Sequence, residues 1–99
     1  MYKISRFSAA IRTPVLWANR KYLRVERRFD GRVSQPRCFV FTDPSGQVIP
    51  TVYMMPDRHG EAVPRPEDAF RKMSYKDVDD LVDDGWRPFS EDEIDVGFA

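Results

Sequence analysis

Cysteine and histidine are almost absent from this 99-residue chain, which contains one of each, Cys38 and His59. A single cysteine cannot form an internal disulfide, and it supplies at most one ligand to a zinc site. Cys38 also begins an aromatic segment, residues 38–42, which predicts a buried structural thiol and not a nucleophile. We therefore expect no metal ion, no cofactor and no catalytic pair of cysteine and histidine.

Long apolar runs are missing as well. No segment approaches the roughly 20 residues of a transmembrane helix, and no apolar signal-peptide region follows the charged N-terminus. Glycine-rich phosphate loops and the Gly-x-Ser-x-Gly nucleophile motif do not occur. The paired aspartates at 79–80 and 83–84 are more typical of a solvated helix face than of a catalytic dyad. These observations predict a cytoplasmic protein that has no membrane contact and is not an enzyme.

The chain is long enough for one domain, residues 1–99, and 41% of its residues are apolar. The clearest strand covers residues 21–29, where Leu23, Val25 and Phe29 alternate with polar residues. Asp30-Gly31 then predicts a tight hairpin turn. Residues 2–7 form a weaker candidate strand, and residues 13–20 could be either a helix or a strand.

Two more strands are predicted at residues 38–42 and 47–55, joined by a type I turn over residues 43–46. Pro50 has no backbone N–H, so the second of these strands should lie at a sheet edge or contain a bulge. Residues 56–66 are rich in proline and should form a loop that leads from the sheet to the helices.

The C-terminal third predicts short helices. One covers residues 66–73, a second is capped by Ser74 and ends at Gly85, and a last helical turn begins at Ser90. Strands followed by helices predict an α+β fold, a mainly antiparallel sheet of about four strands packed by two or three short C-terminal helices. The residues expected to form the core together are Leu23, Val25, Phe39, Phe41, Val78, Leu81 and Val82.

Charge is distributed unevenly although the net charge is zero. Residues 1–40 carry a net charge of +8 and residues 41–99 a net charge of −8. Asp83 and Asp84 are expected at the C-terminal end of a helix, where the helix dipole disfavours negative charge. A stabilising rule broken in this way suggests a functional role, unless these carboxylates pair internally with the arginines.

The first functional hypothesis is a non-enzymatic stoichiometric inhibitor or regulator, because small proteins of this class, phage-encoded ones included, often have such an acidic surface. Its acidic helical surface would engage a basic surface on a larger protein and mimic the charge of nucleic acid. The residues predicted to contact that partner are Asp79, Asp80, Asp83, Asp84, Trp86, Glu91 and Asp92.

The alternative hypothesis is direct binding of nucleic acid by the basic N-terminal strands. Arginine and lysine neutralise phosphates, and an aromatic ring among them can stack on a base. The residues predicted for this role are Arg20, Lys21, Tyr22, Arg24, Arg28 and Arg32. The competing interpretation is that these arginines solvate the open face of the sheet and pair with the acidic helices.

Overall fold

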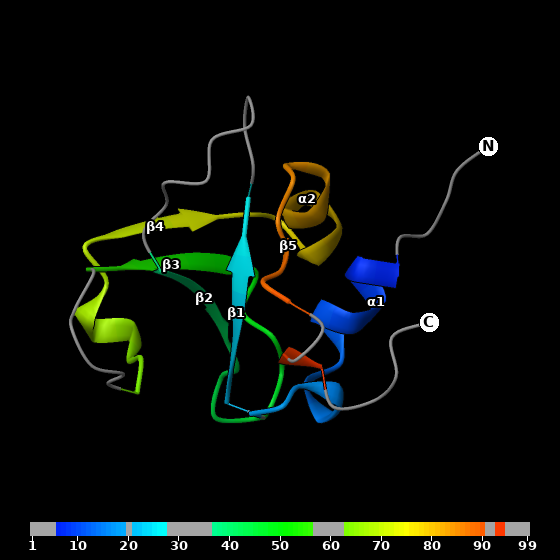
Figure 1. The fold of residues 1–99 in the computed structure, drawn as a ribbon, viewed down its shortest axis with the longest axis horizontal. Helices are drawn as coiled ribbons and strands as arrows, with labels where there is room; N and C mark the ends of the chain where they lie inside the picture. Colours follow the sequence, from blue (N-terminus) through cyan, green and yellow to red (C-terminus); the bar gives the residue numbers. More distant parts are fainter. Residues whose placement is uncertain (1–5, 20, 28–36, 57–62, 91–92, 95–99) are drawn as a thin grey trace.

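The computed structural model describes residues 6–19, 21–27, 37–56, 63–90 and 93–94, and within them it contains a five-stranded antiparallel sheet. The strand order is β4-β3-β2-β1-β5 (Figure 1). The elements are α1 (Arg6–Arg12), η1 (Pro14–Leu16), β1 (Tyr22–Glu26), β2 (Arg37–Phe41), β3 (Thr51–Met55), η2 (Pro66–Asp68), β4 (Arg71–Ser74), α2 (Val78–Asp83) and β5 (Arg87–Pro88). The predicted α+β class is confirmed, with one strand more than expected and with one of the two α-helices ahead of the sheet.

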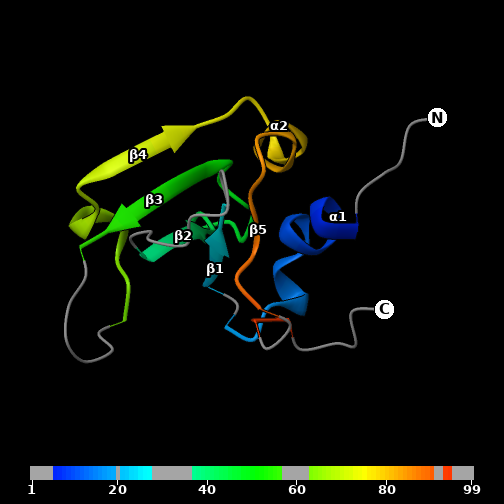
Figure 2. The ribbon, with the colours of Figure 1, turned by 45° about the horizontal axis from the view of Figure 1, so that its top comes forward.

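The helices α1 and α2 lie next to each other on one side of the sheet (Figures 1 and 2). Between them and the sheet is the main core, which contains Leu23 and Val25 from β1, Leu81 from α2 and two fully buried tryptophans, Trp17 and Trp86. The predicted alternation of β1 is confirmed, because Leu23 and Val25 are buried and their neighbours in the strand are half-buried. The helices therefore cover one face of the sheet.

The N-terminal region differs from the prediction. Residues 6 and 7, assigned above to a weak strand over residues 2–7, belong to α1, and residues 2–5 lie outside the described part. The ambiguous stretch 13–20 contains a 3-10 helix that begins at Pro14, because the fixed φ of proline suits a first helical position. The Thr13 hydroxyl does not cap this turn; it donates a hydrogen bond back to the Ala9 carbonyl, at 2.8 Å.

The helix predicted over residues 66–73 is the clearest error. The 3-10 turn η2 covers only residues 66–68, and the chain then extends at Ala69 and forms β4. β4 pairs with β3 in a register that places Val52 opposite Met73. This tertiary pairing overrides the local helical pattern. It also makes β3 an internal strand, so the edge position predicted for residues 47–55 is wrong, and Pro50 lies just before the strand.

The helix α2 begins and ends at identifiable residues. Its N-cap is Asp77, whose carboxylate accepts a hydrogen bond from the Asp80 N–H at 3.0 Å, whereas Ser74, the predicted cap, belongs to β4. Gly85 ends the helix with φ of +101°. Its N–H donates to Val82, and the following N–H, of Trp86, donates to Leu81. This pair of bonds is a Schellman motif, so the predicted termination at Gly85 is confirmed.

Phe39 and Phe41 do not join the helix-covered core, contrary to the prediction. They lie on the other face of the sheet, where Met55 completes a second buried cluster. Cys38 and Val40 face the helices instead, because successive side chains of a strand point to opposite faces. A strand buried on both faces shows no polar alternation, so its sequence could not indicate which residues face which layer.

The predicted turn at residues 43–46 is confirmed by a hydrogen bond from the Gly46 N–H to the Asp43 carbonyl, at 2.9 Å. The predicted hairpin turn at Asp30-Gly31 lies outside the described residues, as does Phe29. Near the C-terminus the Glu93 N–H donates to the Ser90 carbonyl at 3.1 Å, and Ile94 forms an isolated β-bridge with Trp17.

Candidate functional site

The face of the sheet opposite α1 and α2 is rich in aromatic side chains. The register places Tyr22 opposite Phe41, Arg24 opposite Phe39, and Phe39 opposite Tyr53. The Tyr22 and Phe39 rings meet edge to face at 5.7 Å between centroids, and the Phe41 and Tyr53 rings do so at 5.1 Å. Edge-to-face contact is a favourable geometry for such rings. We refer to these four residues as the aromatic cluster.

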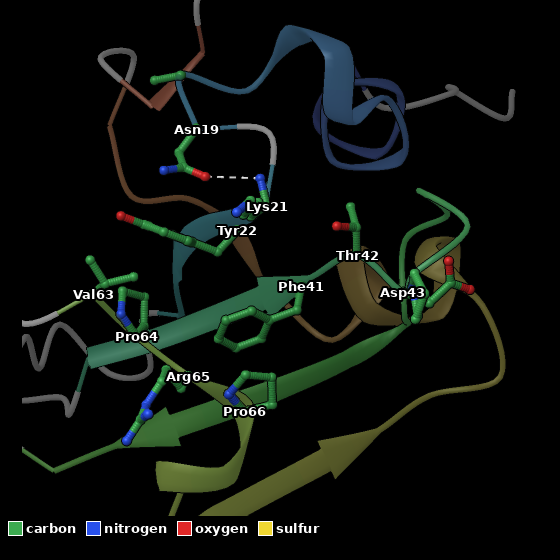
Figure 3. A pocket seen from close by; sticks show the side chains of 12 residues that line it. Asn19, Lys21, Tyr22, Phe41, Thr42, Asp43, Val63, Pro64, Arg65 and Pro66 are labelled. Carbon is green, nitrogen blue, oxygen red and sulfur yellow. Dashed lines mark hydrogen bonds between the residues drawn. The ribbon is translucent and has the colours of Figure 1, made fainter.

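A groove of about 1060 Å³ lies beside Tyr22 and Phe41 of the aromatic cluster (Figure 3). Its residues are Ala18, Asn19, Lys21, Tyr22, Phe41, Thr42, Asp43, Pro44, Val63, Pro64, Arg65 and Pro66. Segment 63–66 forms one wall, with Pro64 near the Tyr22 ring and Pro66 near the Phe41 ring. Phe41 is only 4% exposed, whereas Tyr22 is half-buried. Tyr22 is therefore the ring in this groove that a ligand can reach.

A second hollow of about 330 Å³ shares Ala18, Asn19, Tyr22, Val63 and Pro64 with the first. Its remaining lining residues are Arg24, Arg37, Phe39 and Glu93. The two hollows adjoin at these shared residues, and together we call them the open-face groove.

Two arginines of the open-face groove each lie over an aromatic ring. The Arg24 guanidinium carbon lies 3.8 Å from the centroid of Phe89, and that of Arg37 lies 5.2 Å from the centroid of Phe39. In the part of the chain that the structure describes, neither guanidinium has a carboxylate within ion-pair distance. Aromatic rings, and not ion pairs, therefore hold these two guanidinium groups, although Glu26 lies on the same strand face two residues after Arg24.

Each hollow of the groove has one acidic lining residue, Asp43 in the first and Glu93 in the second. Asp43 accepts hydrogen bonds from the Ser45 hydroxyl at 2.6 Å and from the Gln47 N–H at 3.0 Å, and these bonds hold its pKa below the usual value. Arg65 pairs with Asp68 at 3.2 Å. The groove is thus acidic at the turn that contains Asp43, whereas at the other end two arginines, Arg24 and Arg37, outnumber Glu93.

The acidic residues of α2 fall into two classes. Asp79 accepts hydrogen bonds from the Ser8 hydroxyl and from Arg12, whose nitrogen lies 2.8 Å away, and these contacts lower the pKa of Asp79. Asp80 and Asp83 are exposed, and neither side chain is in an ion pair with any described residue. The predicted acidic surface is therefore only partly open to a partner.

Asp84, the C-cap residue of α2, belongs to a network with the residues that follow β1 and β4 and the residue that precedes β5. Arg27 donates to its carboxylate at 2.6 Å, and so does the Tyr75 hydroxyl. Trp86 donates from Nε1 to the Tyr75 oxygen at 2.9 Å. Burial and the bond to Asp84 raise the pKa of Tyr75. Trp86 is 1% exposed, which places this predicted contact residue inside the core.

The structure brings together Lys21, Tyr22 and Arg24, three of the residues predicted to bind nucleic acid. Other residues named for either hypothesis lie outside the described part, namely Arg20, Arg28, Arg32, Glu91 and Asp92. The sequence interpretation missed Arg37 and Phe89. Arg37 could have been found because it alternates with Phe39 and Phe41, but nothing local links Phe89 to Arg24.

Within the described residues, no three His, Cys, Asp or Glu side chains are grouped so that they could bind a metal ion together. No helix in these ranges is long and apolar enough to span a membrane. Cys38 is buried, and burial raises the pKa of its thiol to about 11. This thiol therefore stays protonated near neutral pH.

No protein-family model matches this chain, and comparison with curated proteins and with solved structures gives no significant match. Function therefore has to be inferred from the chemistry of the open-face groove and of the acidic surface.

Proposed function

We propose that this protein binds single-stranded nucleic acid in the open-face groove. The observation that carries the proposal is the half-buried Tyr22 ring, which shares one groove with Arg24, Arg37 and Lys21. Single strands are bound in this way by stacking of bases on aromatic rings and by pairing of cations with the backbone. The groove contains both kinds of group.

The shape of the site favours a single strand over a duplex. Tyr22 on β1 faces segment 63–66 across the groove, and an unpaired base, whose faces are free, can stack on such a ring. Reading of a duplex commonly requires an exposed helix that enters the major groove. The helices α1 and α2 have only seven and six residues and pack against each other.

The proposal is tested by fluorescence anisotropy with labelled DNA and RNA strands of about 12 nucleotides, within the usual footprint range. We expect binding at low salt that weakens steeply as salt is added. Tyr22→Leu should weaken binding about tenfold, the effect of one lost stacking partner. Tyr53→Leu is the matched control, because Tyr53 belongs to the same aromatic cluster but does not line the groove.

The proposal fails if no strand binds at low salt, or if the two tyrosine variants lose affinity equally. A duplex of the same sequence should bind more weakly than either strand. Equal affinity for duplex and single strand would indicate attraction to phosphate alone and would remove the role assigned to Tyr22.

A second proposal is that the acidic surface of α2 engages a basic partner protein, which would make the chain a non-enzymatic inhibitor or regulator. Asp80 and Asp83 support it, because both are exposed and lie outside the ion pairs formed by Asp79 and Asp84. Charge of this kind accelerates association with an oppositely charged surface. It is the weaker proposal because two of the four aspartates of this surface, Asp79 and Asp84, are already paired inside the molecule.

A further inference from the structure

Resting on the proposed function, we infer that Arg24 and Arg37 form the phosphate subsite of the open-face groove and that Phe89 is the residue that positions Arg24. A strand would place one base on Tyr22 and the adjoining phosphate between the two guanidinium groups. The inference rests on how these three side chains are held.

The pairing of β5 with β1 places Phe89 opposite Arg24. Val25 pairs with Pro88, and the Phe89 N–H donates to the Arg24 carbonyl at 2.9 Å. The two side chains therefore lie directly opposite each other, and the guanidinium stacks 3.8 Å from the ring centroid. Phe89 is 41% exposed, so this stack is at the surface.

Stacking is a useful way to hold an arginine that must bind an anion. A carboxylate would occupy the guanidinium N–H donors, which all lie in the plane of the group. A ring contacts the flat face and leaves those donors directed outward, where they can form paired bonds to phosphate oxygens. Arg24 is thus ordered without its donors being used by an acidic side chain.

Arg37 completes the subsite from β2. Phe39 is paired with Arg24 across the strands, and Arg37 is two residues before Phe39, so Arg37 is a diagonal neighbour of Arg24. Diagonal neighbours on one face are about 7–8 Å apart, a separation that two long side chains can bridge around one phosphate. Both arginines line the same hollow as Tyr22, so a phosphate between them lies next to a base on the tyrosine.

Glu93 lines this hollow too, and it is the acidic side chain that a phosphate would have to approach. The Glu93 carbonyl accepts the Ala18 N–H at 2.7 Å, so its backbone helps to form the wall beside Asn19.

The test is the salt dependence of strand binding by Arg24→Gln, Arg24→Lys and Phe89→Leu. Arg24→Gln should weaken binding and reduce the slope of log affinity against log salt by about 0.7, the value of one contact to a single strand. Arg24→Lys and Phe89→Leu should weaken binding with the slope unchanged, because the charge remains while its geometry is lost. Arg37→Gln should behave as Arg24→Gln does.

Two controls separate these effects from damage to the fold. Phe70→Leu changes an exposed phenylalanine at the opposite edge of the sheet, next to β4, and should leave affinity unchanged. Lys76→Gln removes a charge outside the groove and should leave the slope unchanged. Thermal unfolding of Phe89→Leu shows whether β5 remains in place.

The outcomes distinguish the two proposals. Absence of strand binding by the wild type would overturn the proposed function. Binding that depends on Tyr22 but not on Arg24 or Arg37 would overturn only the phosphate subsite. Loss of affinity in Arg24→Gln without any loss in a folded Phe89→Leu would overturn the positioning role of Phe89.

Discussion

Neighbouring carboxylates at the end of α2 occupy different environments. Asp84 is the C-cap residue and pairs with Arg27, whose side chain is only 17% exposed. Asp83, one residue earlier, is exposed and not in an ion pair with any described residue. The sequence gives both residues the same charge and nearly the same place on the helix dipole, so their difference comes from tertiary contacts.

Asp84→Asn should destabilise the fold by about 1–2 kcal/mol, because it weakens a half-buried pair and the hydrogen bond from Tyr75. Asp83→Asn should change the free energy of unfolding by less than about 0.5 kcal/mol, with a small gain if the dipole term dominates. Urea unfolding of the two variants measures the difference. Equal effects would contradict the network centred on Asp84.

Asp83→Asn also bears on the acidic surface. If that surface binds a basic partner, the variant should lose affinity for a labelled lysine-rich peptide at low salt while keeping its stability. Unchanged peptide binding would leave the acidic surface without the role proposed for it.

At the scale of elements, two turns within the described ranges depend on a glycine with positive φ, and their surroundings differ. Gly85 ends α2 with φ of +101°, and a Cβ added there would lie 3.2 Å from Arg27 Cγ. Gly46 ends the β2–β3 turn with φ of +89°, and a Cβ there would meet nothing within 4 Å. One position is crowded and the other is open.

Gly46→Ala should therefore cost about 1 kcal/mol for the left-handed backbone alone. Gly85→Ala should cost more, since Arg27 must also move and its contact with Asp84 is disturbed. Thermal unfolding of both variants gives the comparison. A smaller cost at Gly85 than at Gly46 would show that the Schellman motif tolerates the methyl group.

The elements also show how much the sequence could predict. β1, the turn at residues 43–46 and the end of α2 at Gly85 carry local signals, namely alternation, turn residues and a C-terminal glycine, and each was predicted. β4 carries no such signal, because an exposed edge strand of Arg71, Lys72, Met73 and Ser74 becomes a strand only by pairing with β3. α1 was not predicted from the sequence. Its buried residues, Ser8, Ala10 and Ile11, pack against α2 and the core, which come from distant parts of the chain.

The candidate site was predictable to a similar degree. Tyr22 and Arg24 were found because alternation places them together on one strand face. Phe89 and segment 63–66 reach the same face from distant parts of the chain, and no local pattern reports such contacts. Site residues that share a strand could be grouped from sequence, whereas those that meet through sheet order could not.

At the scale of the whole molecule, one carboxylate connects the helix α1 to the helix α2. Asp79 in α2 accepts hydrogen bonds from Ser8 and Arg12 in α1, and it is mainly the Ser8 hydroxyl that lowers its pKa. A carboxyl group with a lowered folded-state pKa adds stability above its unfolded pKa, and this stability is lost as pH falls. The contact between the helices should therefore weaken in acid.

Asp79→Asn should reduce stability at pH 7, and the difference from the wild type should be constant over the neutral range. Below about pH 4, the usual aspartate pKa, the difference should shrink. Urea unfolding at pH 7 and at pH 3 compares the two proteins. A difference that persists in full at pH 3 would show that the ionised carboxylate is not what joins the helices.

The strand order has a consequence for a chain that is synthesised from its N-terminus. β1 is made early and can pair with β2 soon afterwards, but its other edge is filled only by β5. A nascent chain therefore exposes that edge on the ribosome until residues 87–89 have emerged, and pairing between distant segments is slow. The stack of Phe89 on Arg24 forms with this final pairing, so the proposed phosphate subsite is complete only once β5 has paired with β1.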